Sequence, residues 1–518
     1  MRRVLAYTLA GLALVFVVVG LVWHARGPAA DAGEGVAAGR APRIRPDYAD
    51  TVVPPNIAPL NFVVDEPGRR FRLVAGGDRG AEIAVESRGP GIVIPVDRWS
   101  ALLAAHRGAA VRFGVSVLDD EGRWLRFEPF VVTVAAEPID RCLVYRKFRT
   151  VYNYYRHMSI CQRDLSTYDE SLVVDNTAFG RGCVNCHAFH DNLPDRMAIQ
   201  MRSNTSLYAS GMVLVDAGHA AKVATGTPAP PAYMSWHPSG RAAVFSMNKV
   251  RQFFHSARPE VRGVVDLDSD LALYVVGSAD AATPAAIRRP DRLETYPDWS
   301  PDGRTLYYCS APMLWSDRDT VPPEHFDEVR YDLMRIPWEP ESGAWGRAEI
   351  VLSAEDTGLS ITLPRVSPDG RFVLFCMSDY GCFPIYQEQT DLYMLDLGPM
   401  VYRRLAVNSE APDSWHSWSS EGRWFVFSSK RMDGLLARPF FAHVDDAGRV
   451  AKPFVMPQQD PAFYDTFLET YNVPELIREP IAVGADEIAA AMRSNPPGEE
   501  GLPTTRPTPV AAGAAGVP

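Results

Sequence analysis

Four segments of the chain repeat one pattern around a glycine, and this repeat constrains the fold more than any other feature. In each segment an apolar run leads into a turn such as Ser-Pro-Asp-Gly, arginine follows the glycine, and a second apolar run begins. Proline presets φ and glycine accepts a positive φ, so each segment is predicted to be two strands joined by a tight turn. The aligned glycines are Gly240, Gly303, Gly370 and Gly422.

A large side chain recurs four positions before each of these glycines. The four residues are Trp236, Trp299, Val366 and Trp418. Sequence repeats of this kind are supersecondary units that bury their apolar faces against one another. We therefore expect the recurring side chains to fill the space between adjacent sheets, and we interpret the tryptophans and the neighbouring His416 as packing rather than as a binding pocket.

These turns resemble the TolB-like propeller repeat, also described as a PD-type or WD-like repeat, in which Ser-Pro-Asp-Gly joins the first two strands of each blade. The resemblance implies a β-propeller over residues 138–475 and is silent about activity, because propellers host many functions. Residues 186–203 imitate the repeat, with Asp195 near the glycine position, and strand-like runs precede them from residue 142. We count six blades, with five as the alternative.

The N-terminal residues predict a membrane anchor. Arg2 and Arg3 precede an uncharged, mostly apolar run over residues 4–23, which has the roughly 20 residues needed to span a bilayer. Residues 1–26 are therefore predicted to be a signal anchor in the inner membrane, a single pass with the rest of the chain in the periplasm. A cleaved signal peptide is the alternative, although the apolar run exceeds its usual core of about 7 to 15 residues.

The remaining segments are assigned from composition and apolar patterning. Residues 27–56 are rich in Ala, Gly and Pro and are predicted to be a flexible linker. Residues 57–137 show short apolar runs separated by turn residues, which predicts a small β-sandwich serving as a spacer, an adhesion module or a cap on the propeller. Residues 476–493 are predicted to be helical and residues 494–518 a disordered tail. The fold class is thus mainly β.

The charge of the chain bears on its partners. The formal net charge is -11 at pH 7, which repels a phosphate backbone, so no nucleic-acid partner is expected. A basic protein partner would suit this charge better.

The sequence CVNCH at residues 183–187 matches the Cys-x-x-Cys-His pattern of c-type haem attachment. Each thiol adds to one vinyl group of the porphyrin, and the histidine that follows becomes an axial ligand of the iron. The motif predicts one covalent haem c on Cys183, Cys186 and His187. A redox dithiol, half of a zinc site and a chance match are the alternatives, but no second closely spaced cysteine pair with histidine is present to complete a zinc site.

A sixth iron ligand is needed if the haem serves electron transfer. Met158 is ranked first because it begins a predicted strand in the neighbouring blade and could approach from the opposite side of the ring. Met197 and Met201 share one strand face and are rivals. His157 should point the other way from Met158, and His190 follows His187 too closely to cross the ring easily.

Five cysteines remain outside the motif. Cys376 and Cys382 could close a loop, and Cys142 and Cys161 lie on successive predicted strands, while Cys309 is left over. Buried free thiols are the alternative to such pairs.

Function is expected to follow from the haem. No catalytic triad, phosphate loop or multi-histidine cluster is visible, and Glu294 and Asp298 have no evident acid-base partner, so whether the chain is an enzyme stays open. The first hypothesis is electron transfer to or from a redox partner that docks on the propeller. The second is a protein-binding scaffold with a structural or sensory haem, and the third is a haem-dependent oxidoreductase.

Overall fold

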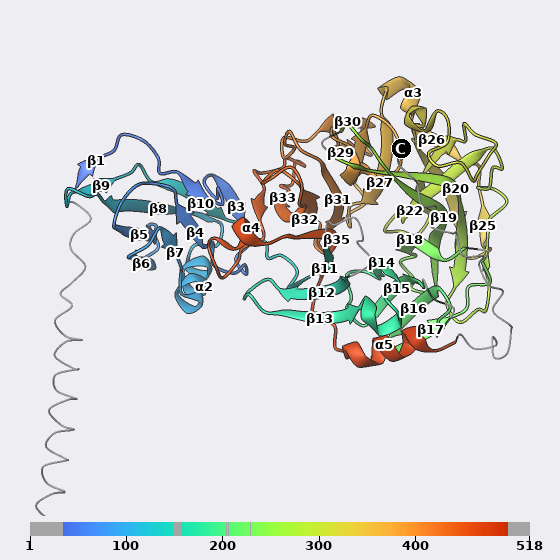
Figure 1. Cartoon of the computed structure of the whole chain (residues 1–518), viewed down its shortest axis with the longest axis horizontal. Helices are drawn as coiled ribbons and strands as arrows, with labels where there is room; N and C mark the ends of the chain where they lie inside the picture. Colours follow the sequence, from blue (N-terminus) through green and yellow to red (C-terminus); the bar gives the residue numbers. More distant parts are fainter. Residues whose placement is uncertain are drawn as a thin grey trace, which may run out of the picture.

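The computed structural model describes residues 35–149, 157–203, 205, 207–227, 229–258 and 260–495. The described chain is mainly β and forms two parts that lie side by side (Figure 1). The smaller part contains the first strands of the chain, and the larger is a ring of sheets. Asn61 joins them, because its side-chain amide donates hydrogen bonds to the carbonyls of Gln458 (3.1 Å) and Gln459 (2.9 Å).

The N-terminal part contains two sheets and one helix. The larger sheet has the order β1-β9-β8-β10-β3, with β5 paired to β8 and β6 to β5, and the smaller has the order β2-β4-β7. The elements are β1 (Val36–Ala37), β2 (Ile44–Arg45), β3 (Thr51–Val53), β4 (Phe62–Val64), β5 (Arg70–Gly76), β6 (Glu82–Ser87), β7 (Gly91–Ile92), α2 (Val96–Ala105), β8 (Ala109–Leu118), β9 (Trp124–Arg126) and β10 (Phe130–Val134).

Two sequence predictions for this part need correction. Residues 36–53 are not a linker, because they supply β1, β2 and β3, and β3 pairs with β10 in the larger sheet. Short strands such as these are stabilised by long-range pairing, which composition does not reveal. The helix α2 was not predicted; it buries Trp99, Leu102 and Leu103 against the sheets, so the part is a two-sheet structure with a helical insertion.

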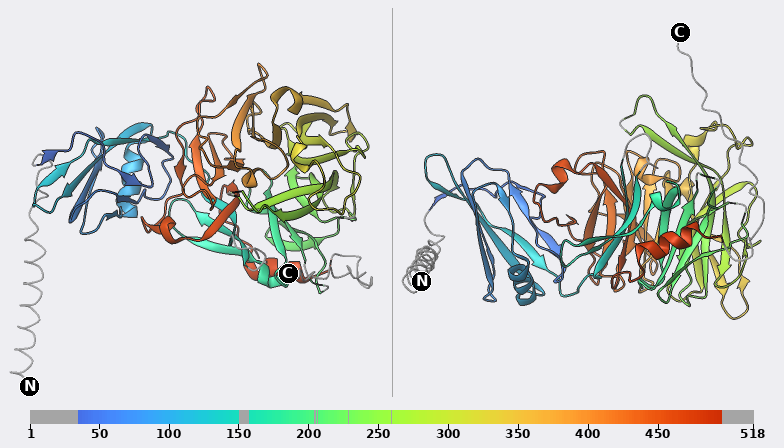
Figure 2. Two further views of the ribbon diagram at one scale, coloured as in Figure 1. Left: turned by 45° about the horizontal axis from the view of Figure 1, so that its top comes forward. Right: turned by 60° about the horizontal axis from the view of Figure 1, so that its bottom comes forward.

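Six sheets form the ring, which is the arrangement of a β-propeller (Figures 1 and 2). We number them as blades 1 to 6. Blade 1 holds β11 (Cys142–Arg149), β12 (Met158–Asp164), β13 (Glu170–Asp175) and β35 (Glu469–Ile477); blade 2 holds β14 (Cys183–Phe189), β15 (Arg196–Arg202), β16 (Gly211–Asp216) and β17 (His219–Val223); blade 3 holds β18 (Pro231–Trp236), β19 (Ala242–Phe254), β20 (Arg262–Val275) and β21 (Ala281–Ala282).

The other three blades follow in chain order. Blade 4 holds β22 (Arg292–Trp299), β23 (Thr305–Pro312), β24 (Asp332–Glu339), β25 (Ala344–Trp345) and β26 (Glu349–Leu352); blade 5 holds β27 (Ser360–Val366), β28 (Phe372–Ser378), β29 (Asp391–Asp396) and β30 (Val401–Arg404); blade 6 holds β31 (Asp413–Trp418), β32 (Trp424–Ser429), β33 (Arg438–His443) and β34 (Phe454–Val455). Short helices lie in connections: η2 (Asn176–Phe179), η3 (Phe326–Glu328), α3 (Ala354–Thr357), η4 (Pro384–Tyr386) and α4 (Phe463–Thr466).

Blade 1 closes the ring with strands from both ends of the propeller. Its sheet order is β13-β12-β11-β35, and β35 pairs antiparallel with β11 from Cys142 opposite Ile477 to Arg149 opposite Glu469. β35 also contacts β14 of blade 2 and β31 of blade 6. The last strand of the ring is therefore held by the first, and the six sheets agree with six predicted units.

The repeated turns have the predicted geometry. Gly240, Gly303, Gly370 and Gly422 have φ of 66°, 68°, 71° and 67°, and each lies between the first and second strands of its blade. The φ values fall in the left-handed region that glycine adopts without steric cost.

The turns of blades 2, 3 and 4 also touch one another. The Nε2 atom of His190 lies 2.9 Å from the Pro238 carbonyl, and Nε2 of His237 lies 3.1 Å from the Gly303 carbonyl. The Trp236 indole donates to the Ala188 carbonyl (3.1 Å). The recurring aromatic residues therefore join neighbouring blades, as predicted.

The C-terminal prediction is correct only in part. Residues 476 and 477 end β35, and the helix α5 (Ala485–Arg493) begins later than predicted. Pairing with β11, which is remote in sequence, keeps residues 476 and 477 in the sheet. Within the described ranges no helix is long and apolar enough to cross a membrane, and the predicted anchor, residues 1–26, lies outside those ranges together with residues 27–34 and 496–518.

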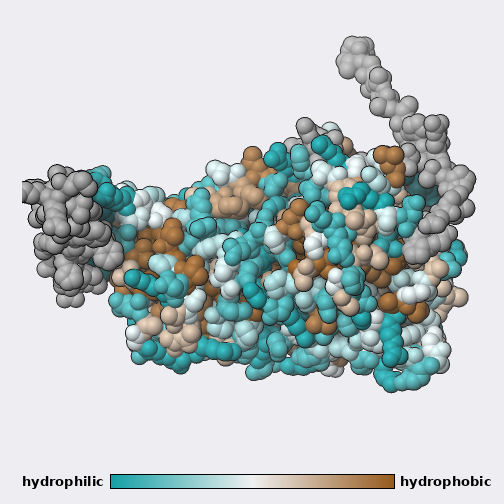
Figure 3. All heavy atoms as spheres, turned by 90° about the horizontal axis from the view of Figure 1, so that it is seen from below, coloured by the Kyte–Doolittle hydropathy of each residue, from teal (hydrophilic) through white to brown (hydrophobic). Residues whose placement is uncertain are grey.

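The surface in Figure 3 mixes hydrophilic and hydrophobic residues over both parts of the molecule. Below it, apolar clusters fill the spaces between blades. His416 belongs to this interior: its Nε2 lies 3.0 Å from the Leu374 carbonyl and its Nδ1 lies 3.7 Å from Sγ of Cys376. Burial lowers the pKa of His416 to about 3, so this histidine is a packed, neutral residue.

We predict that Gly303→Ala destabilises the propeller more than Gly343→Ala. Both glycines have φ near 68°, at 68° and 69°, so both alanines bear the left-handed backbone cost of about 1–2 kcal/mol. A Cβ at residue 303 would lie 2.3 Å from Nε2 of His237, whereas at residue 343 it meets nothing within 4 Å. Thermal unfolding should give a lower Tm for the Gly303 variant, and equal Tm losses would contradict the turn-to-turn contact.

We predict that His416→Gln reduces the loss of stability in acid. The unfolded histidine binds a proton near pH 6.5 and the folded one only near pH 3, so the free energy of unfolding falls with decreasing pH across this window, by up to about 1.4 kcal/mol per pH unit. Urea unfolding between pH 7 and pH 4 should show the wild type losing its advantage over the variant as the pH falls. Parallel curves would show that His416 does not titrate in this way.

Candidate functional site

The Cys-x-x-Cys-His motif lies on β14, the first strand of blade 2. β14 pairs with β15, with Val184 opposite Met201 and His187 opposite Ile199. Three steps along β14 therefore match two along β15, which is a β-bulge. The motif is thus a bulged strand beside β35 of blade 1, which β14 contacts.

His187 is a buried imidazole without a hydrogen-bond partner. It is 2% exposed, and neither Nδ1 nor Nε2 forms a hydrogen bond. Burial lowers the pKa of His187 to about 3, and the positive charge of Arg146 adds to this shift. The backbone of Val144 and Val473 lies near the ring and acts in the opposite direction, but neither residue forms a hydrogen bond of normal geometry with it. A neutral imidazole with two unused nitrogens has the chemistry of a metal ligand.

The two thiols of the motif are buried and reduced. Burial raises the pKa of Cys186 to about 12 and also raises that of Cys183, although the guanidinium of Arg146 opposes both shifts. Cys183 packs in an apolar cluster between blades 1 and 2, whereas Cys186 belongs to the larger cluster that contains Tyr233. Such high pKa values disfavour the thiolate that a redox dithiol or a zinc site requires.

The donor set fits a c-type haem in its chemistry. The motif supplies two free thiols and one buried imidazole whose nitrogens form no hydrogen bond, a costly state for a polar group. The thiols lie in different clusters, so two bonds to one porphyrin require the bulge of β14 to rearrange. Among the described residues, no group of three or more His, Cys, Asp or Glu side chains is arranged to hold a metal ion.

The candidate sixth ligands take different positions around His187. Met158 begins β12, as predicted, is 1% exposed and belongs to the same cluster as Cys183. Since paired residues share a sheet face, Met197 and Met201 lie on the same side of blade 2 as His187. Met158 instead lies on β12 of the facing blade 1.

The two rival histidines are less favourably placed. His157 is exposed, in contrast to the buried Met158. His190 lies on the turn after β14, with Nε2 facing the Pro238 carbonyl and its ring edge-on to Trp236. Neither histidine lies in the cluster between blades 1 and 2.

All seven cysteines are buried and unpaired. The two disulfides considered from the sequence are therefore absent. Cys161 is opposite Tyr145 on the neighbouring strand, whereas Cys142 is opposite Asp164. Residues 142 and 145 are three positions apart and therefore point to opposite faces of the sheet, so Cys142 and Cys161 belong to different apolar clusters. Cys376 instead contacts His416. The structure therefore agrees with the alternative of buried free thiols.

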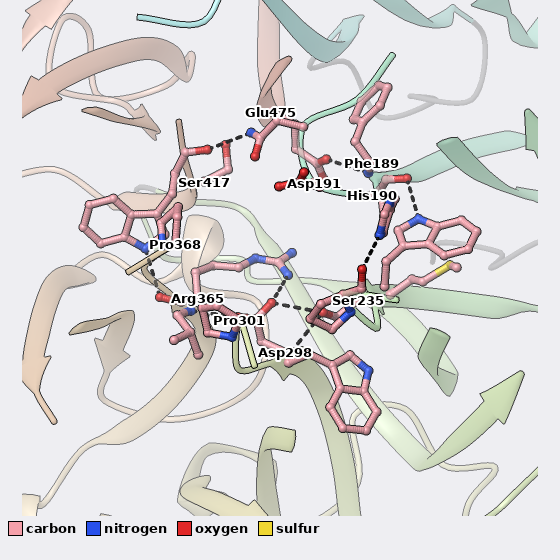
Figure 4. A pocket seen from close by; sticks show the side chains of 18 of the residues that line it. Phe189, His190, Asp191, Ser235, Asp298, Pro301, Arg365, Pro368, Ser417 and Glu475 are labelled. Atoms are coloured by element: carbon pink, nitrogen blue, oxygen red, sulfur yellow. Dashed lines mark hydrogen bonds and ion pairs between the residues drawn. The ribbon is translucent and has the colours of Figure 1, made fainter. Parts of the chain in front are cut away.

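A cavity of about 490 Å³ begins where the motif ends, at one end of the central channel (Figure 4). Asp298 and Arg365 form an ion pair on its wall, with 3.0 Å between Oδ1 and Nη1, and the Ser235 hydroxyl donates to the same carboxylate (3.2 Å). The backbone N–H of Val366 donates to Oδ2 (2.7 Å). Arg365 is thus the charge partner that the sequence did not reveal for Asp298.

Glu475 is a cavity residue that sequence analysis missed. It lies on β35, and Oε2 accepts a hydrogen bond from the Phe189 backbone N–H (3.2 Å). Burial raises the pKa of Glu475 to about 7, against the attraction of Arg365. A lone polar residue in the apolar segment VPELI was the available signal, but its significance depends on ring closure.

Comparisons with known proteins support no assignment of function. No protein-family model and no curated protein matches the chain. The β-propeller domain of the Trilobed protease from Pyrococcus furiosus is 10% identical, covering 67% of this chain and 82% of that one, with a TM-score of 0.32. An oligogalacturonate lyase from Vibrio parahaemolyticus is 12% identical, covering 74% and 100%, with a TM-score of 0.33. At such scores the propeller is assigned from the sheet topology alone.

We predict that Met158→Ala removes the weak charge-transfer band near about 695 nm that ferric His-Met haems show. The thioether would be lost while the haem stays bound, so the protein should still stain for haem. Met197→Ala and Met201→Ala are the matched controls, since both residues are buried in the same cluster. If the band survives in Met158→Ala but disappears in Met197→Ala or Met201→Ala, the sixth ligand comes from blade 2 and the assignment of Met158 is wrong.

Proposed function

We propose that this chain is a membrane-anchored, periplasmic c-type cytochrome with one haem, which transfers electrons to or from a protein that docks on the propeller. The observation that carries the proposal is the buried His187, unpartnered at both ring nitrogens, in a Cys-x-x-Cys-His motif with both thiols free. The apolar run at residues 4–23 supports the anchor, and the net charge of -11 suits a basic partner.

Residues of both blade 1 and blade 2 would hold the haem. Cys183 and Cys186 would form the thioether bonds and His187 would bind the iron. Arg146 and Arg202 place positive charge near both thiols, and the Nε of Arg146 is buried without a hydrogen-bond partner. This charge suits the carboxylates of a porphyrin. When bound, the haem supplies a one-electron redox centre.

Burial at the blade interface bears on the choice between electron transfer and ligand chemistry. Met158 and His187 lie on opposite blades at this interface, which favours a six-coordinate iron, with two protein ligands in addition to the porphyrin, over an open site. A five-coordinate haem that binds carbon monoxide would instead support the sensory or oxidoreductase hypotheses, so carbon monoxide difference spectra distinguish these functions.

We predict that Cys183→Ala combined with Cys186→Ala abolishes covalent haem, because both thioether bonds require these sulfurs. Exported protein would be separated on a denaturing gel and stained for haem peroxidase activity. Cys142→Ala combined with Cys161→Ala is the matched control, because it also removes two buried free thiols of this region and should leave the stain unchanged. Staining that persists in the first variant would refute the attachment site.

A further inference from the structure

The cavity at the end of the channel is built by all six blades. Figure 4 shows its polar side chains arranged around a hollow. In blade order the contributing residues are Glu475, His190, Ser235, Asp298, Arg365 and Ser417. Its volume of about 490 Å³ falls in the range of about 300–1,000 Å³ that is typical of small-molecule sites.

Three carboxylates, those of Asp191, Asp298 and Glu475, and the guanidinium of Arg365 line this cavity. Asp298 and Arg365 form an ion pair that the Ser235 hydroxyl and the Val366 N–H complete. Among the described residues, the Phe189 N–H is the one group that donates a hydrogen bond to the Glu475 carboxylate. The positive charge of Arg365 attracts this carboxylate at longer range. The Glu475 carboxylate therefore keeps acceptor capacity that the protein does not use.

Most other donors of the lining are already used by the protein, although the Trp299 indole N–H has no hydrogen-bond partner. Trp236 and Trp418 line the cavity, but their indole N–H groups already donate to the carbonyls of Ala188 and Arg365, at 3.1 and 3.0 Å. Ser417 donates to the Pro474 carbonyl (2.9 Å). Asp191 is paired with Arg478 (3.1 Å).

We propose that this cavity binds a small organic cation, a primary alkylammonium or alkylguanidinium, through the carboxylate of Glu475. A cation would neutralise the unpaired carboxylate and form charge-assisted hydrogen bonds with it in a partly buried setting. The indole walls add a surface that attracts cations. The proposal does not depend on the presence of haem.

The test is isothermal titration calorimetry at about pH 8.5, where Glu475 is ionised, on the purified full chain with four probes of similar size. Butylammonium and butylguanidinium should bind, whereas butyrate and butanol should not. In Glu475→Gln the affinity for both cations should fall at least about tenfold, because the amide keeps an acceptor for the Phe189 N–H but loses the charge. Circular dichroism checks that the variant is folded.

Glu294→Gln is the matched control, since Glu294 is a buried glutamate of blade 4 that lines a different cavity. It should bind the cations as the wild type does. Should Glu475→Gln fail to fold, Glu475→Asp retains the charge on a shorter side chain and should bind more weakly than the wild type. Equal binding of butyrate or butanol, an unchanged affinity in the Glu475 variants, or no binding of either cation would overturn the proposal.

Discussion

The pairing of β35 with β11 is the interaction on which the rest of the propeller depends. It joins strands separated by more than three hundred residues of chain and turns an open series of sheets into a ring. The same strand carries Val473 beside His187 and Glu475 into the channel cavity. Without this closure, blade 2 would present an uncovered β14, and neither the haem motif nor the cavity would be enclosed.

Much of the ring was predictable because its information is local. The glycine turns and the large side chain four positions before each glycine specify a strand pair in each repeat, and the positive φ of Gly303 and its equivalents agrees with that interpretation. The burial of Met158 beside an exposed His157 follows from strand alternation in the same way. Each of these features needs only a few neighbouring residues.

The features that could not be predicted depend on remote partners. Thr51–Val53 is a strand only because β10 lies beside it, and its Pro-rich, Ala-rich surroundings are typical of a linker. Glu475 matters only because closure places it opposite Arg365 and Asp298. The bulge at residues 184–187, which separates the two thiols, arises from pairing with β15. Sequence patterns describe the elements of this protein, but these sites arise where the elements meet.

The claim that organises this account is that β14 is a haem-attachment strand, and peptide mapping of exported protein by mass spectrometry tests it most directly. The account predicts that the peptide containing Cys183, Cys186 and His187 carries the added mass of one haem through both cysteines, and that the pyridine haemochrome spectrum is that of a c-type haem. Recovery of this peptide unmodified, with both thiols free, from cells competent for haem attachment would contradict it.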